Sequence, residues 1–237
     1  MRTSLINIDK NAKTVKGQAR GYMTGIMYLA SGERSGYNVC PAKTEACERA
    51  CLYTAGRGIF ERTQNGRIAK TKMFFEKREL FMRMLETDIW ILLNEAEGAG
   101  MTPCVRLNGT SDISWEDLDI MQKFPNIQFY DYTKVVERMF KELPANYHLT
   151  FSRSDENLQE CMSVLRHGQN IAAVFDSANF PEEYWGLPVV NGDQDDLRFL
   201  DPTPCIVGLK AKGPARKEAD GGGFVLNTQN VVNELVA

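Results

Sequence analysis

The sequence predicts an α/β fold: a complete or partial (β/α) barrel of the TIM type with mostly parallel strands. Beyond residue 100, short apolar runs alternate with amphipathic segments of about ten residues, the order that parallel strands and crossover helices produce. Polar residues crowd the carboxyl ends of these runs, where parallel α/β folds place their chemistry. An open, doubly wound sheet is the alternative that the same pattern allows.

The first expected strand is the run of small, β-branched and aromatic residues at 21–30. Residues 61–97 are expected to form one or two long helices, because large apolar residues recur there at helical spacing and Gly98 follows. With the first run we expect about seven strands, close to a full barrel. The others are 103–108, 127–133, 147–152, 170–177, 187–192 and 204–211. The helices between them are expected at 114–124, with Ser114 as a cap, at 135–143 and at 157–168.

One domain is expected to span residues 1–237, since no linker rich in Pro or Ser divides the chain. Residues 1–20 form a polar N-terminal segment without the apolar stretch of a secretory signal. No run approaches the roughly 20 apolar residues that span a bilayer, so we expect a cytoplasmic protein without a membrane partner. Reduced cysteines in that compartment point to metal binding or catalysis.

Three of the six cysteines lie within twelve residues, as Cys40, Cys47 and Cys51 in a loop over residues 37–58. Thiolates suit zinc or iron–sulfur clusters. A closed zinc site needs a fourth protein ligand, and both histidines are remote in the sequence. A cluster with three cysteine ligands leaves one iron open, so the loop predicts an iron–sulfur cluster of the 4Fe-4S type, with zinc or no metal as alternatives. The remaining cysteines lie in apolar segments and are expected in the core: Cys104, Cys161 and Cys205.

A three-cysteine loop after the first strand of a parallel barrel resembles the radical SAM enzymes. Their usual spacing is C-x3-C-x2-C, whereas this chain has C-x6-C-x3-C. In those enzymes the open iron binds S-adenosylmethionine, which the resemblance implies as a second cofactor. The residues implied are Asn108, Thr110 and Ser111 for the methionine group, Ser152 and Arg153 for the ribose or carboxylate, and Lys210 for adenine.

Several segments resemble the phage gene product 88 family. They are YNVCPAKTEACERACLYTAGRG, VRLNGTSDISWE, FYDYTK, YHLTFSRS, NGDQDDLRFLDP and IVGLKAKG, and they fall between residues 37 and 213. The resemblance implies a phage-encoded protein in the host cytoplasm, whose host protein partner is unknown, and it leaves the chemistry open.

Two carboxylates are candidates for catalysis. Asp112 follows the second expected strand, and Asp193 follows a later one in a cluster with Asp195 and Asp196. Each suits general acid–base work, or a nucleophile in a base exchange. The structural alternative is a loop in which an aspartate caps the next turn and pairs with Arg198.

Residues 57–83 carry eight basic and three acidic residues with phenylalanines between them. Such a face can follow a phosphate backbone, so nucleic acid is a candidate partner. The alternative is a solvated helix face with internal ion pairs such as Arg57–Glu61.

Three hypotheses follow from these patterns. The leading one is an iron–sulfur enzyme of radical SAM-like build that acts on a nucleotide or nucleic acid. The second is a nucleobase-exchange transglycosylase that uses Asp112 or Asp193, with a structural metal site. The third is a non-enzymatic iron–sulfur protein that binds nucleic acid or a host partner.

Overall fold

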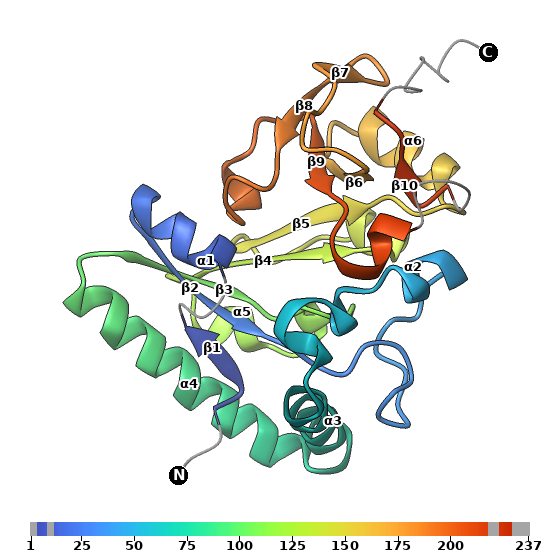
Figure 1. Ribbon diagram of the computed structural model, residues 1–237. Coiled ribbons are helices and arrows are strands. Elements are labelled where there is room, and N and C mark those ends of the chain that lie inside the picture. The colour runs from blue at the N-terminus through green and yellow to red at the C-terminus, as the bar shows by residue number, and fades with distance from the viewer. Residues whose placement is uncertain (1–3, 9–11, 218–222, 229–237) are drawn as a thin grey trace.

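The computed structural model describes residues 4–8, 12–217 and 223–228 of the chain, and they form a mixed α/β fold around a ten-strand sheet (Figure 1). The strands are β1 (Ile6–Ile8), β2 (Tyr22–Met27), β3 (Thr102–Arg106), β4 (Gln128–Thr133), β5 (Tyr147–Ser152), β6 (Ile171–Phe175), β7 (Glu183–Tyr184), β8 (Leu187–Asn191), β9 (Ile206–Lys210) and β10 (Val225–Leu226). The α-helices are α1 (Ala12–Gly17), α2 (Glu45–Arg49), α3 (Glu61–Glu76), α4 (Arg78–Gly98), α5 (Ile120–Lys123) and α6 (Leu158–Arg166). The 3₁₀ segments are η1 (Gln18–Arg20), η2 (Leu52–Thr54), η3 (Gly56–Ile59), η4 (Trp115–Asp117), η5 (Val136–Phe140), η6 (Arg198–Leu200) and η7 (Gly213–Lys217).

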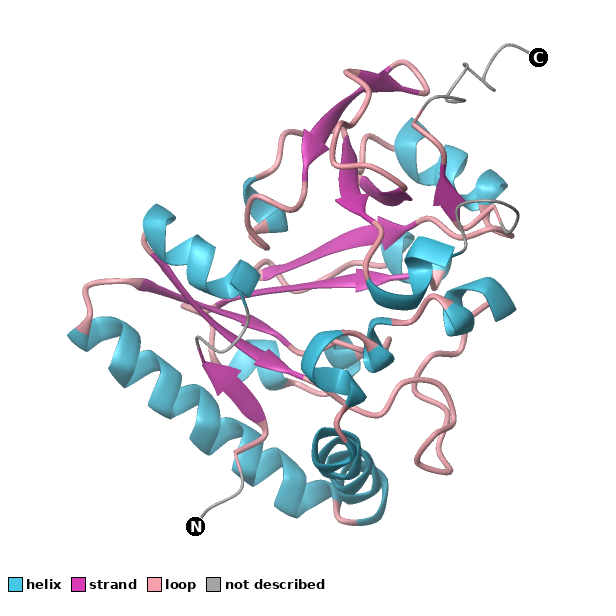
Figure 2. Cartoon of the chain, viewed as in Figure 1, coloured by secondary structure: helices cyan, strands magenta, loops and turns pink. Residues whose placement is uncertain are grey.

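The strand order is β1-β2-β3-β4-β5-β6-β9-β8-β7, and β10 pairs with β6 (Figure 2). The pairs from β2 to β6, and those that add β9, β8 and β10, are parallel. The β1–β2 and β7–β8 pairs are antiparallel, so the sheet is mostly but not entirely parallel. Among the described residues no pairing joins the edge strands β1 and β7, so the sheet is open and a complete barrel is not confirmed.

The seven expected strands correspond to β2, β3, β4, β5, β6, β8 and β9. Two expected helices are wrong in detail. The segment 135–143 forms only η5, and 114–124 divides into η4 and α5 at Asp119, whose φ of 53° interrupts a helix. Ser114 makes no side-chain capping bond. The polar N-terminal segment also contains β1, which is too short for its periodicity to be recognised.

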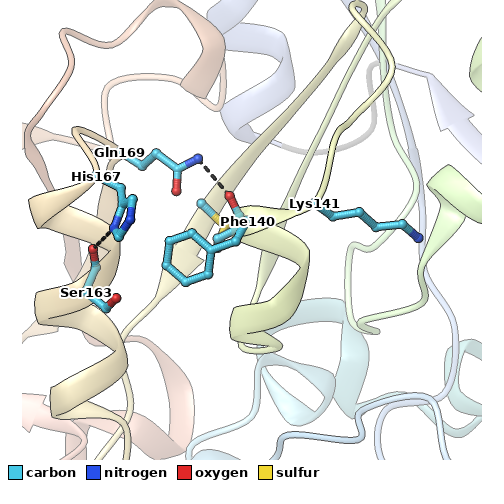
Figure 3. A pocket seen from close by; sticks show the side chains of 6 residues that line it. Phe140, Lys141, Ser163, His167 and Gln169 are labelled. Atoms are coloured by element: carbon cyan, nitrogen blue, oxygen red, sulfur yellow. Dashed lines mark hydrogen bonds between the residues drawn. The ribbon is translucent and has the colours of Figure 1, made fainter.

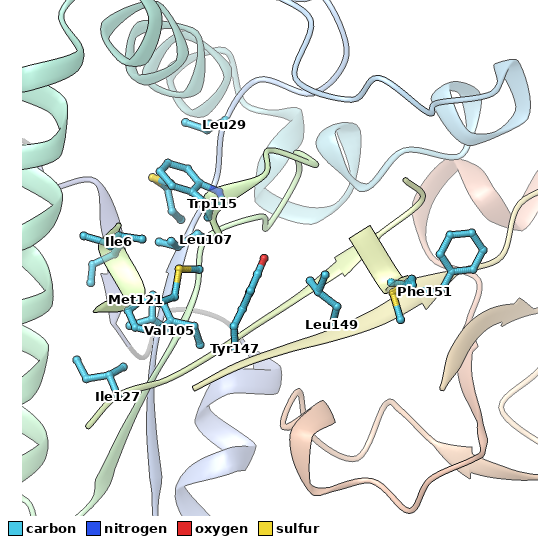
Figure 4. Packing of buried hydrophobic residues seen from close by; sticks show 14 of the residues in the cluster. Ile6, Leu29, Val105, Leu107, Trp115, Met121, Ile127, Tyr147, Leu149 and Phe151 are labelled. Carbon is cyan, nitrogen blue, oxygen red and sulfur yellow. The ribbon is translucent and has the colours of Figure 1, made fainter. Parts of the chain in front are cut away.

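The larger part of the core lies between the sheet and α4. Phe81, Leu85, Ile89 and Leu92 are fully buried on one stripe of α4, which packs against β1, β2 and β3. Figure 4 shows the same core continuing along the sheet through Leu107, Trp115, Tyr147 and Phe151, among others. Asp88 lies on the buried stripe of α4, where its carboxylate accepts the backbone N–H groups of Leu5 and Ile6 at 2.5 and 3.2 Å and so fixes β1.

The opposite face of the sheet is covered by α1 and by the segment that contains η6. Phe199 packs there against Tyr22 in a T-shaped pair and against Tyr130 in a tilted pair, with ring centroids 5.4 and 5.5 Å apart. The same face carries charge, because Arg106 pairs with the buried Asp196 at 2.9 Å. Side chains and chain segments therefore cover both faces of the sheet. We look for a functional site at the ends of the strands.

Candidate functional site

The cysteine loop lies across the carboxyl ends of the parallel strands, on the side to which the arrowheads of β4 and β5 point (Figure 1). Backbone and side-chain hydrogen bonds fasten it there. Asp112, after β3, donates its N–H to the carbonyl of Val39 at 2.7 Å. Thr44 donates its hydroxyl to Asp155, after β5, at 2.6 Å. An apolar cluster completes the attachment to the ends of β9 and β10: Ala46, Ala50, Ala211, Ala215, Phe224 and Val225.

Local capping places two of the thiols. Thr44 caps α2 by accepting the backbone N–H of Cys47 at 3.0 Å. Cys51 caps η2 in the same manner, since its sulfur accepts the N–H of Tyr53 at 3.4 Å. Cys51 also donates its thiol to the hydroxyl of Ser31 at 3.3 Å. The cap fixes the backbone of Cys47, and the two bonds of Cys51 fix its side chain.

Cys40 faces the same region. Its sulfur accepts the N–H of Gly32 at 3.4 Å, and the thiol lies 3.9 Å from the carbonyl of Thr110. Burial raises the pKa of Cys40 to about 11, and the nearby negative charges of Cys51, Asp112 and Cys47 add to the rise. All three thiols are half-buried and free. Within the described part of the chain, no group of three His, Cys, Asp or Glu residues is arranged to hold a metal ion. The thiols thus offer suitable donor atoms without a preformed ligand geometry.

A stack of arginines and tyrosines lies beside Cys51. The Arg67 guanidinium lies over the rings of Tyr28 and Tyr53, at 4.9 and 5.2 Å from their centroids, and donates to the Tyr53 carbonyl at 3.2 Å. Arg34 lies over Tyr53 as well, at 4.9 Å. Burial lowers the pKa of Arg67, and no described carboxylate forms an ion pair with it. The thiols are therefore next to positive charge. The sequence predicted only a basic face over residues 57–83 and gave no signal for this stack.

The loop after β3 is closed by its own hydrogen bonds. The side-chain oxygen Oδ1 of Asn108 accepts from the Ser111 hydroxyl at 2.8 Å, the Ile113 N–H at 3.0 Å and the Trp115 indole at 3.1 Å. Asn108 also donates its amide to the Ile113 carbonyl at 2.9 Å. Asn108 and Ser111 therefore shape the loop, and their contact with a cofactor stays a prediction.

Thr110 and Gly109 join this loop to the segment after β2. Thr110 donates its hydroxyl to the carbonyl of Leu29 at 2.6 Å. A Cβ on Gly109 would lie 2.4 Å from the Met27 carbonyl oxygen and 2.7 Å from the Tyr28 ring. Only glycine permits this close approach. The bond from Thr110 likewise explains its position without a cofactor.

Asp112 is the anchor of a buried ion-pair network. Its carboxylate accepts from Arg138 Nη1 at 2.5 Å and from the Lys134 N–H at 2.7 Å. Arg138 also donates to both oxygens of Glu116 at 2.8 Å and to the Tyr147 hydroxyl at 2.9 Å. Both oxygens of Asp112 are thus engaged, and the catalytic role predicted for it has no support in its contacts.

Asp131 lies at the inner end of the same network. Its carboxylate accepts the Asn108 N–H at 2.7 Å and the Tyr147 hydroxyl at 3.0 Å. Burial outweighs these bonds and the neighbouring charges of Arg106 and Arg138, and raises the pKa of Asp131 to about 7. The side chain points to the α4 side of the sheet, since its β4 neighbour Phe129 on that side packs in the same core.

Asp193 is held by lysines. It pairs with Lys13 at 3.0 Å and Lys212 at 2.6 Å, and accepts the Lys210 N–H at 2.8 Å. Burial acts to raise its pKa, but these partners prevail and lower the pKa of Asp193 to about 2. These partners favour the ionised carboxylate at neutral pH, and its catalytic role stays a prediction. The structural alternative holds for Asp195, which caps the next turn and pairs with Arg198 at 3.3 Å.

Three further candidates lie at the ends of β5 and β9. The Ser152 hydroxyl accepts from Lys134 Nζ at 3.1 Å. The buried Arg153 donates to the Gly223 carbonyl at 2.7 Å, and its Nε has no hydrogen-bond partner among the described groups. Lys210 is exposed. The structure thus brings these side chains to the strand ends, and their contact with a cofactor stays a prediction.

A family model for gene product 88 matches residues 4–227. The chain belongs to the phage gene product 88 family. No curated protein and no solved structure matches it. Of the helices described, none is both long and apolar enough to cross a membrane.

The gene product 88 chain also has a surface hollow between η5 and α6, far in sequence from the cysteine loop (Figure 3). His167 lies against Phe140 with ring centroids 4.7 Å apart, and its Nδ1 lies 2.8 Å from the Ser163 carbonyl. Gln169 donates to the Met139 carbonyl at 2.9 Å. These bonds hold α6 in place, and the hollow contains no charge cluster or thiol.

The basic residues of 57–83 divide into two groups. Four are engaged within the molecule: Arg67 on its tyrosines, Lys70 on the Leu5 carbonyl, Arg78 on the Phe74 ring and Arg83 with Glu79. Four others are exposed and form no ion pair among the described residues: Arg57, Arg62, Lys72 and Lys77. The Arg57–Glu61 pair of the structural alternative is not formed.

Proposed function

We propose that the cysteine loop holds a 4Fe-4S cluster and that the protein is an enzyme of radical SAM-like build that acts on a nucleotide or nucleic acid. The observation that carries the proposal is the position of the thiols. Three half-buried cysteines lie on one loop that is fastened to β3, β5, β9 and β10. Chemistry in parallel α/β folds occurs at this edge.

Cys40, Cys47 and Cys51 would supply the thiolates, and the loop would have to close to bring the sulfurs to one metal site. A bound cluster would provide one-electron transfer and an open iron position. The backbone N–H groups of Gly32 and Tyr53 already point at two of the sulfurs, as second-shell donors to thiolates do. The positive charge of Arg67 would offset the thiolate charge.

The sheet supports the same proposal. The strands β2 to β6 follow one another in space as they do in sequence, and the order reverses only beyond β6, where β9 lies between β6 and β8. Such a sequential order favours a partial (β/α) barrel. The first strand of this series leads directly into the cysteine loop, as in the enzymes that the loop resembles.

Anaerobic purification tests the cluster. We expect a coloured protein with iron and sulfide in similar amounts and an electron paramagnetic signal on reduction. Cys47→Ala should abolish all three, whereas Cys205→Ala, a buried cysteine remote from the loop, should retain them. A colourless wild-type protein with one zinc per chain would sink the cluster.

Addition of S-adenosylmethionine to the reduced protein tests the reaction class. Release of 5′-deoxyadenosine that depends on Cys47 is the expected result. Full iron loading without binding or cleavage of S-adenosylmethionine would remove the enzyme hypothesis and keep a passive cluster protein.

A further inference from the structure

An exposed apolar patch begins one residue after the third cysteine. Leu52, Ile59 and Phe60 are 52, 60 and 58% exposed, all within nine residues of the chain. Leu52 lies in η2, Ile59 ends η3 and Phe60 follows it; because η2 and η3 pack against each other, the three exposed side chains come from adjacent segments. Large apolar side chains gathered at the surface mark interaction sites.

Charge on this patch is positive and uncompensated. Arg57 and Arg62 flank the apolar residues, are exposed, and form no ion pair in the described parts of the chain. Glu61 is the one acidic residue between positions 52 and 62. Other arginines of this region turn inward onto aromatic rings, as Arg67 and Arg78 do. The two exposed arginines are thus available to a polyanion.

We infer that residues 52–62 form a binding surface for single-stranded nucleic acid. Unpaired bases can stack on the Phe60 ring and cover Ile59 and Leu52, while Arg57 and Arg62 meet the backbone phosphates. A duplex hides its bases and would leave the apolar side chains in water. A nucleic-acid strand on this surface passes beside Cys51, so single-stranded nucleic acid is the substrate class of the proposed enzyme. This role as a substrate rests on the proposed function, whereas the binding itself does not.

Fluorescence anisotropy with a labelled oligothymidylate and a matched duplex tests the surface. The wild type should bind the single strand more tightly. Arg57→Gln with Arg62→Gln should make the slope of log K against log salt shallower by about 1.4, for two phosphate contacts on a single strand. Phe60→Ala should weaken binding about tenfold without changing the slope, because one stacked base is lost. The matched control, Lys72→Gln with Lys77→Gln, removes the same charge from α3 and should change the slope less.

Circular dichroism should confirm that each variant is folded. A wild type that binds no oligonucleotide, or equal slopes for the two double variants, overturns the inference. If Phe60→Ala leaves oligonucleotide binding unchanged and alters only the sedimentation of the protein alone, the patch is a contact between copies of the chain. This result also overturns the inference. Metal content is measured on the same samples: a metal-free wild type that still binds the strand refutes the proposed cluster and leaves this inference intact.

Discussion

Two polar regions meet at the carboxyl end of the sheet, and they differ in how charge is compensated. In the Asp112–Arg138 network every ion has a partner, since Arg138 contacts two carboxylates and a tyrosine hydroxyl. Beside Cys51, Arg67 lies on two aromatic rings and has no carboxylate partner among the described residues. In this region Arg34 pairs with Glu48 at 3.6 Å, so the contrast lies between the complete network and the single arginine Arg67, which has no described carboxylate partner.

The difference has a physical basis. A buried charge is retained at tolerable free energy only when it is paired. The residues of the Asp112–Arg138 network are accounted for by their structural role, because they stabilise the loop after β3. Arg67 is half-buried beside Cys51 without a carboxylate, and thiolates on the metal that we propose would supply the missing negative charge.

The largest effect is expected from breaking the complete network. Arg138→Met removes the only described cation bound to both Asp112 and Glu116 and leaves the two carboxylates unpaired. The free energy of unfolding should fall by about 3–5 kcal/mol in urea titrations. The exposed Arg83–Glu79 pair gives the control, because Arg83→Met should change it by less than about 0.5 kcal/mol. Similar losses in both variants would contradict a network role.

An intermediate effect is expected from Asp131, through pH. Its folded pKa of about 7 exceeds the unfolded value of about 3.9, so between these values the folded protein keeps a proton that the unfolded chain has lost. Its contribution to stability is therefore full below about pH 4 and is lost as the pH rises to about 7. The slope reaches at most about 1.4 kcal/mol per pH unit.

Asp131→Asn should remove this slope, because its amide does not titrate; the amide oxygen can still accept the Asn108 N–H, while the amide NH2 would face the Tyr147 hydroxyl oxygen. The measurement is the difference between wild-type and variant unfolding free energies at each pH, in which other titrating groups cancel. A difference that does not change across this range would show that burial does not control the carboxyl group.

The smallest effect on stability is expected from the incomplete region. Arg67→Gln in metal-free protein removes two ring contacts and an unpaired charge, so the unfolding free energy should change by no more than about 1 kcal/mol. In metal-loaded protein, metal affinity in a chelator titration should fall about 10- to 100-fold, as it does when a group that contacts the ligands of a metal is removed. Arg62→Gln, on the exposed side of α3, is the control and should leave metal affinity unchanged. Equal affinities would remove Arg67 from the site.

The parallel strands were predictable from their short runs of β-forming residues; β5, in which apolar and polar residues alternate with the period of a strand, matches the expected 147–152. Helices were less predictable where tertiary contacts override local propensity: at Asp119 a left-handed residue divides the expected helix. The cysteines were predictable from their spacing. The roles of Asn108 and Asp193 were not, because their partners come from distant positions such as Trp115 and Lys13.

The sequence by itself determined the α/β alternation, the three-thiol loop and membership of the gene product 88 family, since each is written in local order and spacing. Only the tertiary structure decided that the sheet is open and that Arg67 turns inward to Cys51 while Arg57 and Arg62 stay exposed. Helical periodicity places a side chain on a face but does not say what packs against that face. Charge compensation depends on those long-range contacts, and it separates the network that stabilises the fold from the loop that we propose to be functional.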